Sequence, residues 1–429
     1  MLFFGSGLKY RLTKAATAVF LGLFCILPCF ATFTLDPTFD GDGKITHSIP
    51  DSTTNYSSGA LRVFIQPNGR IVVGGFYTNL GWSGFSASGV AFVGFTPNGL
   101  GDPTFSQSHL WQPDGNTNLQ DALMYPDGTT LRMLGIFRFL VGIRYVSVGR
   151  NDTNGGHDNI FSSNAGIGGE QPNPIQIALR SDGKILTFIS DQGAFYLYRL
   201  NPNGTRDTTF GSNGVLSIVF NKFSPTNIVE MIALPDGKIL LVGRSNIGAG
   251  EFFFGRLTET GMWDKSFGRA GFLRVQFGPG LTGGVSRALL QTDGKILLSG
   301  SVTSGDSDAW LARFRPNGRP DPTFGNNGVV IHDFAAGATD AAQSIALSSD
   351  GKIRLVGYLG TPRNFLVARF SATGTFEEST TIPFTPNEYA EAADVALQSD
   401  GKLVVVGTTR NPNTTATTGS VFAIARLIE

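Results

Sequence analysis

Short apolar runs separated by two-residue turns recur along the whole chain and predict β-hairpins. An Asp-Gly or Asn-Gly pair stands between two such runs seven times, at Asn68-Gly69, Asp127-Gly128, Asp182-Gly183, Asp236-Gly237, Asp293-Gly294, Asp350-Gly351 and Asp400-Gly401. These pairs favour the type I′ turn, because both of its central residues take a positive φ. The intervals between the turns are 59, 55, 54, 57, 57 and 50 residues. This period predicts an array of seven copies of one supersecondary unit.

The copy at residues 288–331 shows the order of the strands most clearly. Residues 288–291 and 296–300 flank the first turn, and a third strand is predicted at 309–314. A second turn, Asn317-Gly318, leads to a fourth strand at 329–331. Apolar runs such as 239–242 do not alternate with polar residues, which indicates burial on both faces of the sheet. The fold class is therefore all-β: a seven-bladed β-propeller of four-stranded antiparallel blades.

The two ends of the propeller sequence are predicted to meet in one blade. The final segment, 422–427, matches the third strand of the unit, and no fourth strand follows it. The segment 35–45 carries the same features as 321–330, including the sequence Asp-Pro-Thr-Phe. We therefore expect the amino-terminal strand to complete the last blade, with Ile45 beside Ile424. This arrangement removes the open sheet edges of a linear array.

The repeated motifs are similar to those of a known family. The pattern Ala-Leu-x-x-Asp-Gly-Lys-Ile-Leu-Leu-Val-Gly, followed by Ala-Arg-Phe-x-Pro-Asn-Gly-x-x-Asp-Pro-Thr-Phe-Gly, resembles the delta-60 repeat of secreted bacterial proteins. The resemblance covers essentially the whole mature chain and is specific from Asp182 onward, whereas blades one and two depart from it. It implies a seven-bladed propeller without an established activity.

Residues 1–31 are predicted to be a signal peptide and residues 32–429 the propeller. Lys9, Arg11 and Lys14 precede an apolar stretch at 15–27, and small residues stand at −3 and −1 of a cleavage site after Ala31. A retained membrane anchor is the alternative, although this stretch is short for a spanning helix. We expect a secreted or periplasmic protein.

Composition narrows the classes of partner. Cys25 and Cys29 both lie in the predicted signal peptide, so the mature chain would have no disulfide and no thiolate. Removing three basic residues changes 33 positive and 33 negative charges to 30 and 33, a net charge of −3. This charge gives no electrostatic reason to expect nucleic acid or an anionic membrane as partner. We expect a monomer without a membrane span in the mature chain.

One charged pattern recurs with the repeat. An arginine stands four residues before the second turn, and an acid follows eight residues after the arginine. The pairs are Arg150 and Asp158, Arg199 and Asp207, Arg256 and Asp264, Arg313 and Asp321, Arg369 and Glu377, and, by ring closure, Arg426 and Asp36. Blade one has Gly94 at the arginine position, so Asp102 is expected to lack its partner. An ion pair in each blade is the favoured interpretation, and an anion-binding ring of arginines in the channel is the alternative.

The sequence predicts no catalytic, cofactor-binding or metal-binding residues, and no cofactor. The four histidines are His47, His109, His157 and His332, and they are scattered through different units. Asp40-Gly41-Asp42 resembles a calcium loop, but the equivalent segment 268–271 reads Gly-Arg-Ala-Gly, which disfavours that interpretation. Tyr77, Trp82 and Trp111 cluster in blade one, where core packing is favoured over a binding rim.

Two functions remain open at this point. The first is an exported, non-enzymatic binding or structural module for an extracellular or envelope protein or glycan. The alternative is a polysaccharide lyase or hydrolase that uses the central channel. Acids converging with a histidine or tyrosine in the channel would favour the enzyme. A lining of glycine and small apolar residues would favour the scaffold.

Overall fold

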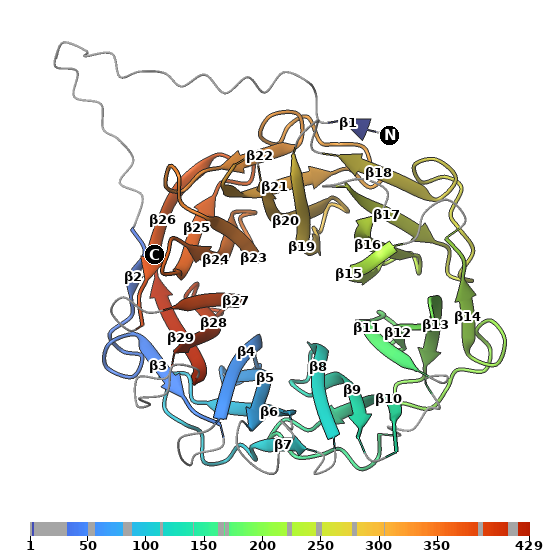
Figure 1. Cartoon of the computed structure of the whole chain (residues 1–429), viewed down its shortest axis with the longest axis horizontal. Coiled ribbons are helices and arrows are strands. Elements are labelled where there is room, and N and C mark those ends of the chain that lie inside the picture. The colour runs from blue at the N-terminus through green and yellow to red at the C-terminus, as the bar shows by residue number, and fades with distance from the viewer. Residues whose placement is uncertain are drawn as a thin grey trace.

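The computed structural model describes residues 2–3, 32–49, 56–79, 88–111, 115–139, 141–161, 167, 171–220, 225–245, 251–276, 281–303, 305–384, 389–410 and 419–429. The described chain forms a ring of seven antiparallel sheets around a central channel, which confirms the predicted β-propeller (Figure 1). Within these residues there is no helix that could cross a membrane. Apart from residues 2–3, the predicted signal peptide lies outside the described part, and so do Cys25 and Cys29.

The strands of each blade follow one another from the channel outward. In blades 1 to 4 they are β4 (Tyr56–Ile65), β5 (Ile71–Asn79), β6 (Ser88–Phe95) and β7 (Ser108–Trp111); β8 (Gly115–Met124), β9 (Thr130–Arg138) and β10 (Ile143–Asn151); β11 (Pro172–Leu179), β12 (Ile185–Asp191), β13 (Ala194–Leu200) and β14 (Val215–Ile218); and β15 (Pro225–Ala233), β16 (Ile239–Ser245), β17 (Glu251–Leu257) and β18 (Phe272–Gln276). A two-residue strand, β1 (Leu2–Phe3), pairs in parallel with β18.

Blades 5 to 7 follow the same order. Their strands are β19 (Thr282–Leu290), β20 (Ile296–Thr303), β21 (Ser307–Phe314) and β22 (Val329–His332); β23 (Asp340–Leu347), β24 (Ile353–Leu359), β25 (Asn364–Phe370) and β26 (Phe376–Ile382); and β27 (Ala390–Leu397), β28 (Leu403–Arg410), β29 (Ser420–Ile428) and β3 (Lys44–His47). In blade 2 three strands lie in the described residues, and most of residues 162–170 lies outside them.

Blade 7 closes the ring as the sequence predicts. β3 pairs antiparallel with β29, and Ile45 stands opposite Ile424. β2 (Thr34–Leu35) pairs with the far end of β29, and the Asp36 amide donates to the Arg426 carbonyl at 2.9 Å. Ile45 and Ile424 belong to one buried apolar cluster with residues of blade 1. The amino-terminal segment therefore contributes both ladder hydrogen bonds and core packing.

The core lies between the blades. The described residues form seven apolar clusters, and one of them joins Leu240, Val242 and Phe254 of blade 4 to Leu298 and Trp310 of blade 5. The central strands are buried on both faces, because each sheet is covered by a neighbour on either side. This packing explains why the second and third strands lack alternation of apolar and polar residues.

Deleting residues 35–49 tests the closure. We expect the midpoint of thermal unfolding to fall by several degrees, because β29 loses its outer partner and the cluster around Ile424 becomes exposed to water. Calorimetry on the deleted and full chains measures the change. The control is Thr46→Val, an exposed change within β3, which should leave the midpoint nearly unchanged. Equal midpoints for the deletion and the control would contradict a closing role for this segment.

Candidate functional site

Each blade holds an ion pair at the connection from its third to its fourth strand. In blade 5, Arg313 Nε lies 2.8 Å from Asp321 Oδ2, and both side chains are buried. Asp321 Oδ1 accepts hydrogen bonds from the amide and the hydroxyl of Thr323. The guanidinium carbon of Arg313 lies 4.7 Å from the centre of the Phe324 ring. These contacts fix the Asp-Pro-Thr-Phe segment against the third strand.

The pair occurs in all seven blades. The nitrogen–oxygen distances are 2.6–2.9 Å for Arg70–Asp102, Arg150–Asp158, Arg199–Asp207, Arg256–Asp264, Arg313–Asp321, Arg369–Glu377 and Arg426–Asp36. Six of these pairs confirm the spacing argument. The expectation that Asp102 lacks a partner is wrong, because Arg70 from the first turn of blade 1 pairs with it. At this turn position blades 3 to 7 have a lysine that contacts the same acid, as Lys295 contacts Asp321 at 3.4 Å.

The arginine also contacts the next blade. Arg313 Nη1 donates to the carbonyl of Ala372 in blade 6, and four other blades make the same contact: Arg70 to Thr153, Arg150 to Pro202, Arg256 to Pro316 and Arg426 to Pro97. In the turn that follows Ala372, Gly374 has a φ of +83°, and a Cβ there would lie 2.9 Å from the Phe324 ring. We call the arginine, its acid, the phenylalanine and the next blade's turn the blade latch.

The arginines do not form an anion site in the channel. Six of them lie on third strands and Arg70 lies in a first turn, whereas the first strands line the channel (Figure 1). Each arginine is also neutralised by the acid of its own blade. The structural interpretation of the pairs is therefore confirmed.

A second repeated feature lies on the first strands, which surround the channel (Figure 1). Every first strand has a β-bulge against the second strand, at Leu61, Gln120, Ile175, Val229, Ser286, Gln343 and Ala393. A bulge leaves one residue out of the hydrogen-bond ladder and re-aims its side chain. The bulged residues of blades 2 to 6 line a cavity of about 340 Å³. The bulges therefore shape the channel wall.

The residue after each bulge is polar. We call this set the polar channel ring: Arg62, Asp121, Gln176, Glu230, Arg287, Ser344 and Asp394. Its contacts run from blade to blade. Arg62 Nη2 lies 3.2 Å from Asp121 Oδ1, and Ser344 Oγ donates to Asp394 Oδ1 at 2.7 Å. Asp394 Oδ2 accepts the Val63 amide of blade 1 at 3.2 Å.

Glu230 of blade 4 and Arg287 of blade 5 form a second ion pair of this ring, with 3.4 Å between Oε2 and Nη1. Burial raises the pKa of Glu230, and the charge of Glu230 raises the pKa of Arg287. The charges of Asp394 and Asp121 act on Arg287 in the same direction. Three acids and two arginines leave the ring with a net charge of −1. Because its charges are paired and nearly cancel, the polar channel ring does not favour a highly charged ligand.

Tyr389 and Glu391 lie near this channel wall. They combine an acid with a tyrosine, which is the kind of pair expected of an enzyme. The Tyr389 hydroxyl donates to Glu391, Arg363 Nη1 lies 2.9 Å from the same carboxylate, and Gln343 donates to it at 3.1 Å. Burial, followed by Glu391, raises the pKa of Tyr389 to about 12. The Tyr389 phenol therefore stays protonated near neutral pH and is a weak general base there.

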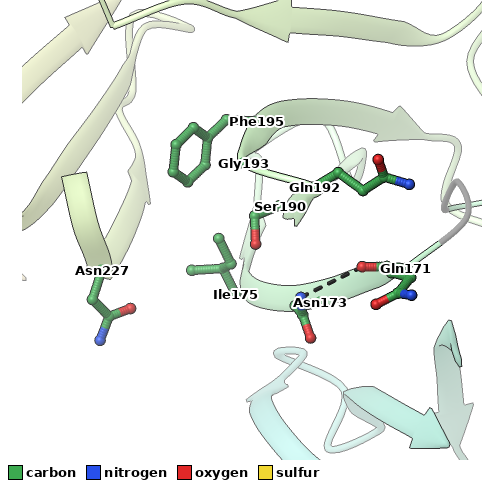
Figure 2. Close-up of a pocket in the computed structure, with 8 residues that line it drawn as sticks. All are labelled: Gln171, Asn173, Ile175, Ser190, Gln192, Gly193, Phe195 and Asn227. Carbon is green, nitrogen blue, oxygen red and sulfur yellow. Dashed lines mark hydrogen bonds between the residues drawn. The ribbon is translucent and has the colours of Figure 1, made fainter. Parts of the chain in front are cut away.

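A second hollow lies between blades 3 and 4. A groove of about 440 Å³ is lined there by Gln171, Asn173, Ile175, Ser190, Gln192, Gly193, Phe195 and Asn227, and we call it the amide groove (Figure 2). None of these side chains is charged. Ile175 and Asn227 also line the channel cavity, so the two hollows share a wall. The volume is in the usual range for small-ligand sites.

A short hairpin leaves this groove open. Only Gln192 and Gly193 separate β12 from β13, whereas three to nine residues make this connection in the other blades. Both turn residues have positive φ, +48° and +84°, as a type I′ turn requires. Asn173 Oδ1 accepts a hydrogen bond from Arg144 of blade 2 at 3.1 Å, which orients the amide. The Phe195 ring stacks on Phe188 with centroids 5.8 Å apart.

The remaining residues singled out from the sequence have structural surroundings. His47 and His332 lie on β3 and β22, the fourth strands of their blades, and contact aromatic rings. Tyr77 is buried in a core cluster, which confirms core packing for this residue. Trp82 and the side chain of Trp111 lie outside the described residues. Asp42 Oδ1 accepts the Lys44 amide at 2.9 Å and thereby caps its own turn.

The polar channel ring and the amide groove were not found from the sequence. The ring had a usable signal, because each of its members stands six residues before the Asp or Asn of a first turn. The groove had no such signal, because it is lined by residues of two blades and depends on one unusually short hairpin.

Comparison with known proteins supports the fold. A family described as "Domain of unknown function (DUF5122) beta-propeller" matches residues 180–210, 291–324 and 398–427. No curated protein matches the sequence significantly. These three segments each run from a first turn to the latch region, in blades 3, 5 and 7.

Several solved structures are weakly similar to this chain. A puromycin hydrolase S511A mutant complexed with PGG is 13% identical over 85% of this chain and 52% of its own, with a TM-score of 0.43. A protein of unknown function from Dyadobacter fermentans is 14% identical over 90% and 99%, with a TM-score of 0.42. Polysaccharide lyase Uly1 is 10% identical over 89% and 94%, also at 0.42. The chain spans about half the length of the hydrolase, and the likeness concerns the fold alone.

Arg313→Ala tests the latch. We expect a loss of about 3 kcal/mol in the free energy of unfolding, because Asp321 stays buried without its main partner. Denaturant titration measures the loss. The control is Arg315→Ala, which removes a half-exposed arginine 4.0 Å from the same acid and should cost little. A cost for Arg313→Ala no larger than that of the control would refute the latch.

The latch acids also predict acid sensitivity. Burial raises the pKa of Asp36 and Asp321, but hydrogen bonds from Thr38 and Thr323 and the nearby cations outweigh it and lower both pKa values to about 2. A lowered pKa stabilises the fold above the unfolded value of about 4 and loses this contribution as the pH falls through about 2. Thermal midpoints measured between pH 5 and pH 2 should therefore fall. They should fall less in Asp321→Asn. This variant has a lower midpoint at pH 5, but it has one acid of lowered pKa fewer to protonate.

Proposed function

We propose that the protein is an exported, non-enzymatic binding module that holds a neutral saccharide in the amide groove. The observation that carries this proposal is the lining of the groove, which combines amide and hydroxyl side chains with one aromatic ring and no charge. We further infer membership of the delta-60 repeat family and residence outside the cytoplasm, in agreement with the repeated motifs and the basic, apolar amino terminus.

The chemistry of the lining suits sugar hydroxyls. A hydroxyl group donates one hydrogen bond and accepts others, and the amides of Asn173, Gln192 and Asn227 offer both donors and acceptors. An aliphatic sugar face can pack on an aromatic ring, which Phe195 supplies beside Ile175 (Figure 2). A charged ligand would find no counter-charge in this lining and would lose its hydration without compensation.

The acids nearby support binding over catalysis. Asp121 and Asp394 are bound by an arginine or a hydroxyl together with backbone amides, and Glu391 is bound by three donors. A general acid or base must be within hydrogen-bond reach of its substrate, and these carboxylates are already engaged by groups of the chain. We therefore place the enzyme alternative second and test it in the same experiment.

Two variants of the groove test the proposal. On an array of neutral and charged glycans we expect the full chain to retain a neutral saccharide. Calorimetric titration should then show Asn227→Ala and Phe195→Leu weakening its affinity about threefold to tenfold each, the value of one hydrogen bond or one packing contact. The leucine keeps part of the packing against Phe188, so the variant remains folded.

The matched control is Asn364→Ala, an amide at the equivalent hairpin of blade 6 and outside the groove. It should bind like the unchanged chain. Recovery of the saccharide intact after long incubation supports a binding module, whereas cleavage that disappears in Glu391→Gln would establish the enzyme. Binding that survives both groove variants would refute this site.

A further inference from the structure

Three aspartates meet at the seam between blades 5 and 6. Asp308 lies near the start of β21, Asp333 directly follows β22, and Asp340 is the first residue of β23. Each offers a carboxylate oxygen, and these oxygens lie within 4.8 Å of one another. Two oxygens bound to one Ca²⁺ at 2.3–2.6 Å can be at most about 5 Å apart. The spacing is therefore that of ligands around a single ion.

Two of the three aspartates are buried, and the carboxylate of one of them is held in place. Asp340 is fully buried, and its oxygens accept the amides of Ala309 at 2.6 Å and Phe334 at 3.1 Å. Asp308 is only 5% exposed, on the strand position directly before Ala309. The site is thus built from backbone that is already fixed by the sheet and by the connection between the blades.

The negative charges lack compensation. Asp308 Oδ1 is buried and has no hydrogen-bond partner in the described part of the chain. Every latch acid has an arginine within 2.9 Å, whereas no lysine or arginine of the described residues forms an ion pair with these three. An unpaired buried carboxylate is costly, so the cluster calls for a cation.

We propose that Asp308, Asp333 and Asp340 bind one Ca²⁺ ion at the seam between blades 5 and 6. An all-carboxylate ligand set without histidine or cysteine suits a hard cation. The exposed Asp333 leaves the outer side of the ion open to water, which completes the six to eight ligands that Ca²⁺ takes. The ion would join the third strand of blade 5 to the first strand of blade 6, and so stabilise the fold.

Calcium titration of the full chain, first stripped with EDTA, tests the site. We expect calorimetry to show one ion bound per chain, and the midpoint of thermal unfolding to rise with CaCl₂ concentration. Asp308→Asn should abolish both responses. In EDTA this variant should be at least as stable as the unchanged chain, because it no longer buries an unpaired charge.

Asp333→Asn is the second variant, and its exposed side chain makes misfolding no concern. It should bind Ca²⁺ at least about tenfold more weakly, for the loss of one charged ligand. The control is Asp42→Asn in the acidic loop 40–43, which should respond to Ca²⁺ like the unchanged chain. Absence of binding heat and of any shift in the midpoint would overturn the proposal, as would an unchanged response in both Asp308→Asn and Asp333→Asn.

Discussion

The ring depends on an arginine that binds two blades at once. Apolar packing between sheets is strong but has no preferred direction, so it does not by itself fix how one blade is placed on the next. The latch adds direction at five of the seven seams; Arg313, for example, pairs with Asp321 in its own blade and donates to Ala372 in the next. The closing seam uses the same parts, with Arg426 from the last strand and Asp36 from the first segment. Closure therefore needs no contact that the other seams lack.

Burying so many charged groups is tolerable because every latch acid is paired with an arginine of its own blade. Asp321 accepts hydrogen bonds from an amide and a hydroxyl and forms ion pairs with an arginine and a lysine. These contacts offset the cost of removing its carboxylate from water. The polar channel ring follows the same logic less strictly, since Glu230 Oε2 and Arg287 Nε have no hydrogen bond in the described residues. The three aspartates at the seam of blades 5 and 6 form no ion pair with a lysine or arginine of the described residues.

The sequence predicted the repeated features and missed those that occur once. The period predicts the seven turns, the latch pairs and the contact of Ile45 with Ile424, because a feature seen in one repeat is expected at the same position in the others. Arg70 was missed because it stands directly before β5 and replaces an arginine that is absent from the neighbouring strand β6, where Gly94 occupies the position. The three aspartates and the amide groove combine residues from neighbouring blades, and no spacing in the chain marks such a meeting. Local patterns thus determine the blades, whereas the sites arise from how blades face each other.

The two faces of the ring consequently differ in what they can do. In an antiparallel meander the first turns and the latch segments lie on one face, and the hairpins between second and third strands lie on the other, together with the blade-to-blade connections. The latch face repeats nearly the same contacts seven times, and its charges are consumed in pairs, so it offers little to distinguish one ligand from another. The opposite face varies from blade to blade: the Gln192-Gly193 hairpin is short enough to open the amide groove, and Asp308 and Asp340 border the same face at another seam. A ring that fixes its geometry on one side leaves the other side free to diverge, and recognition is expected where that divergence lies.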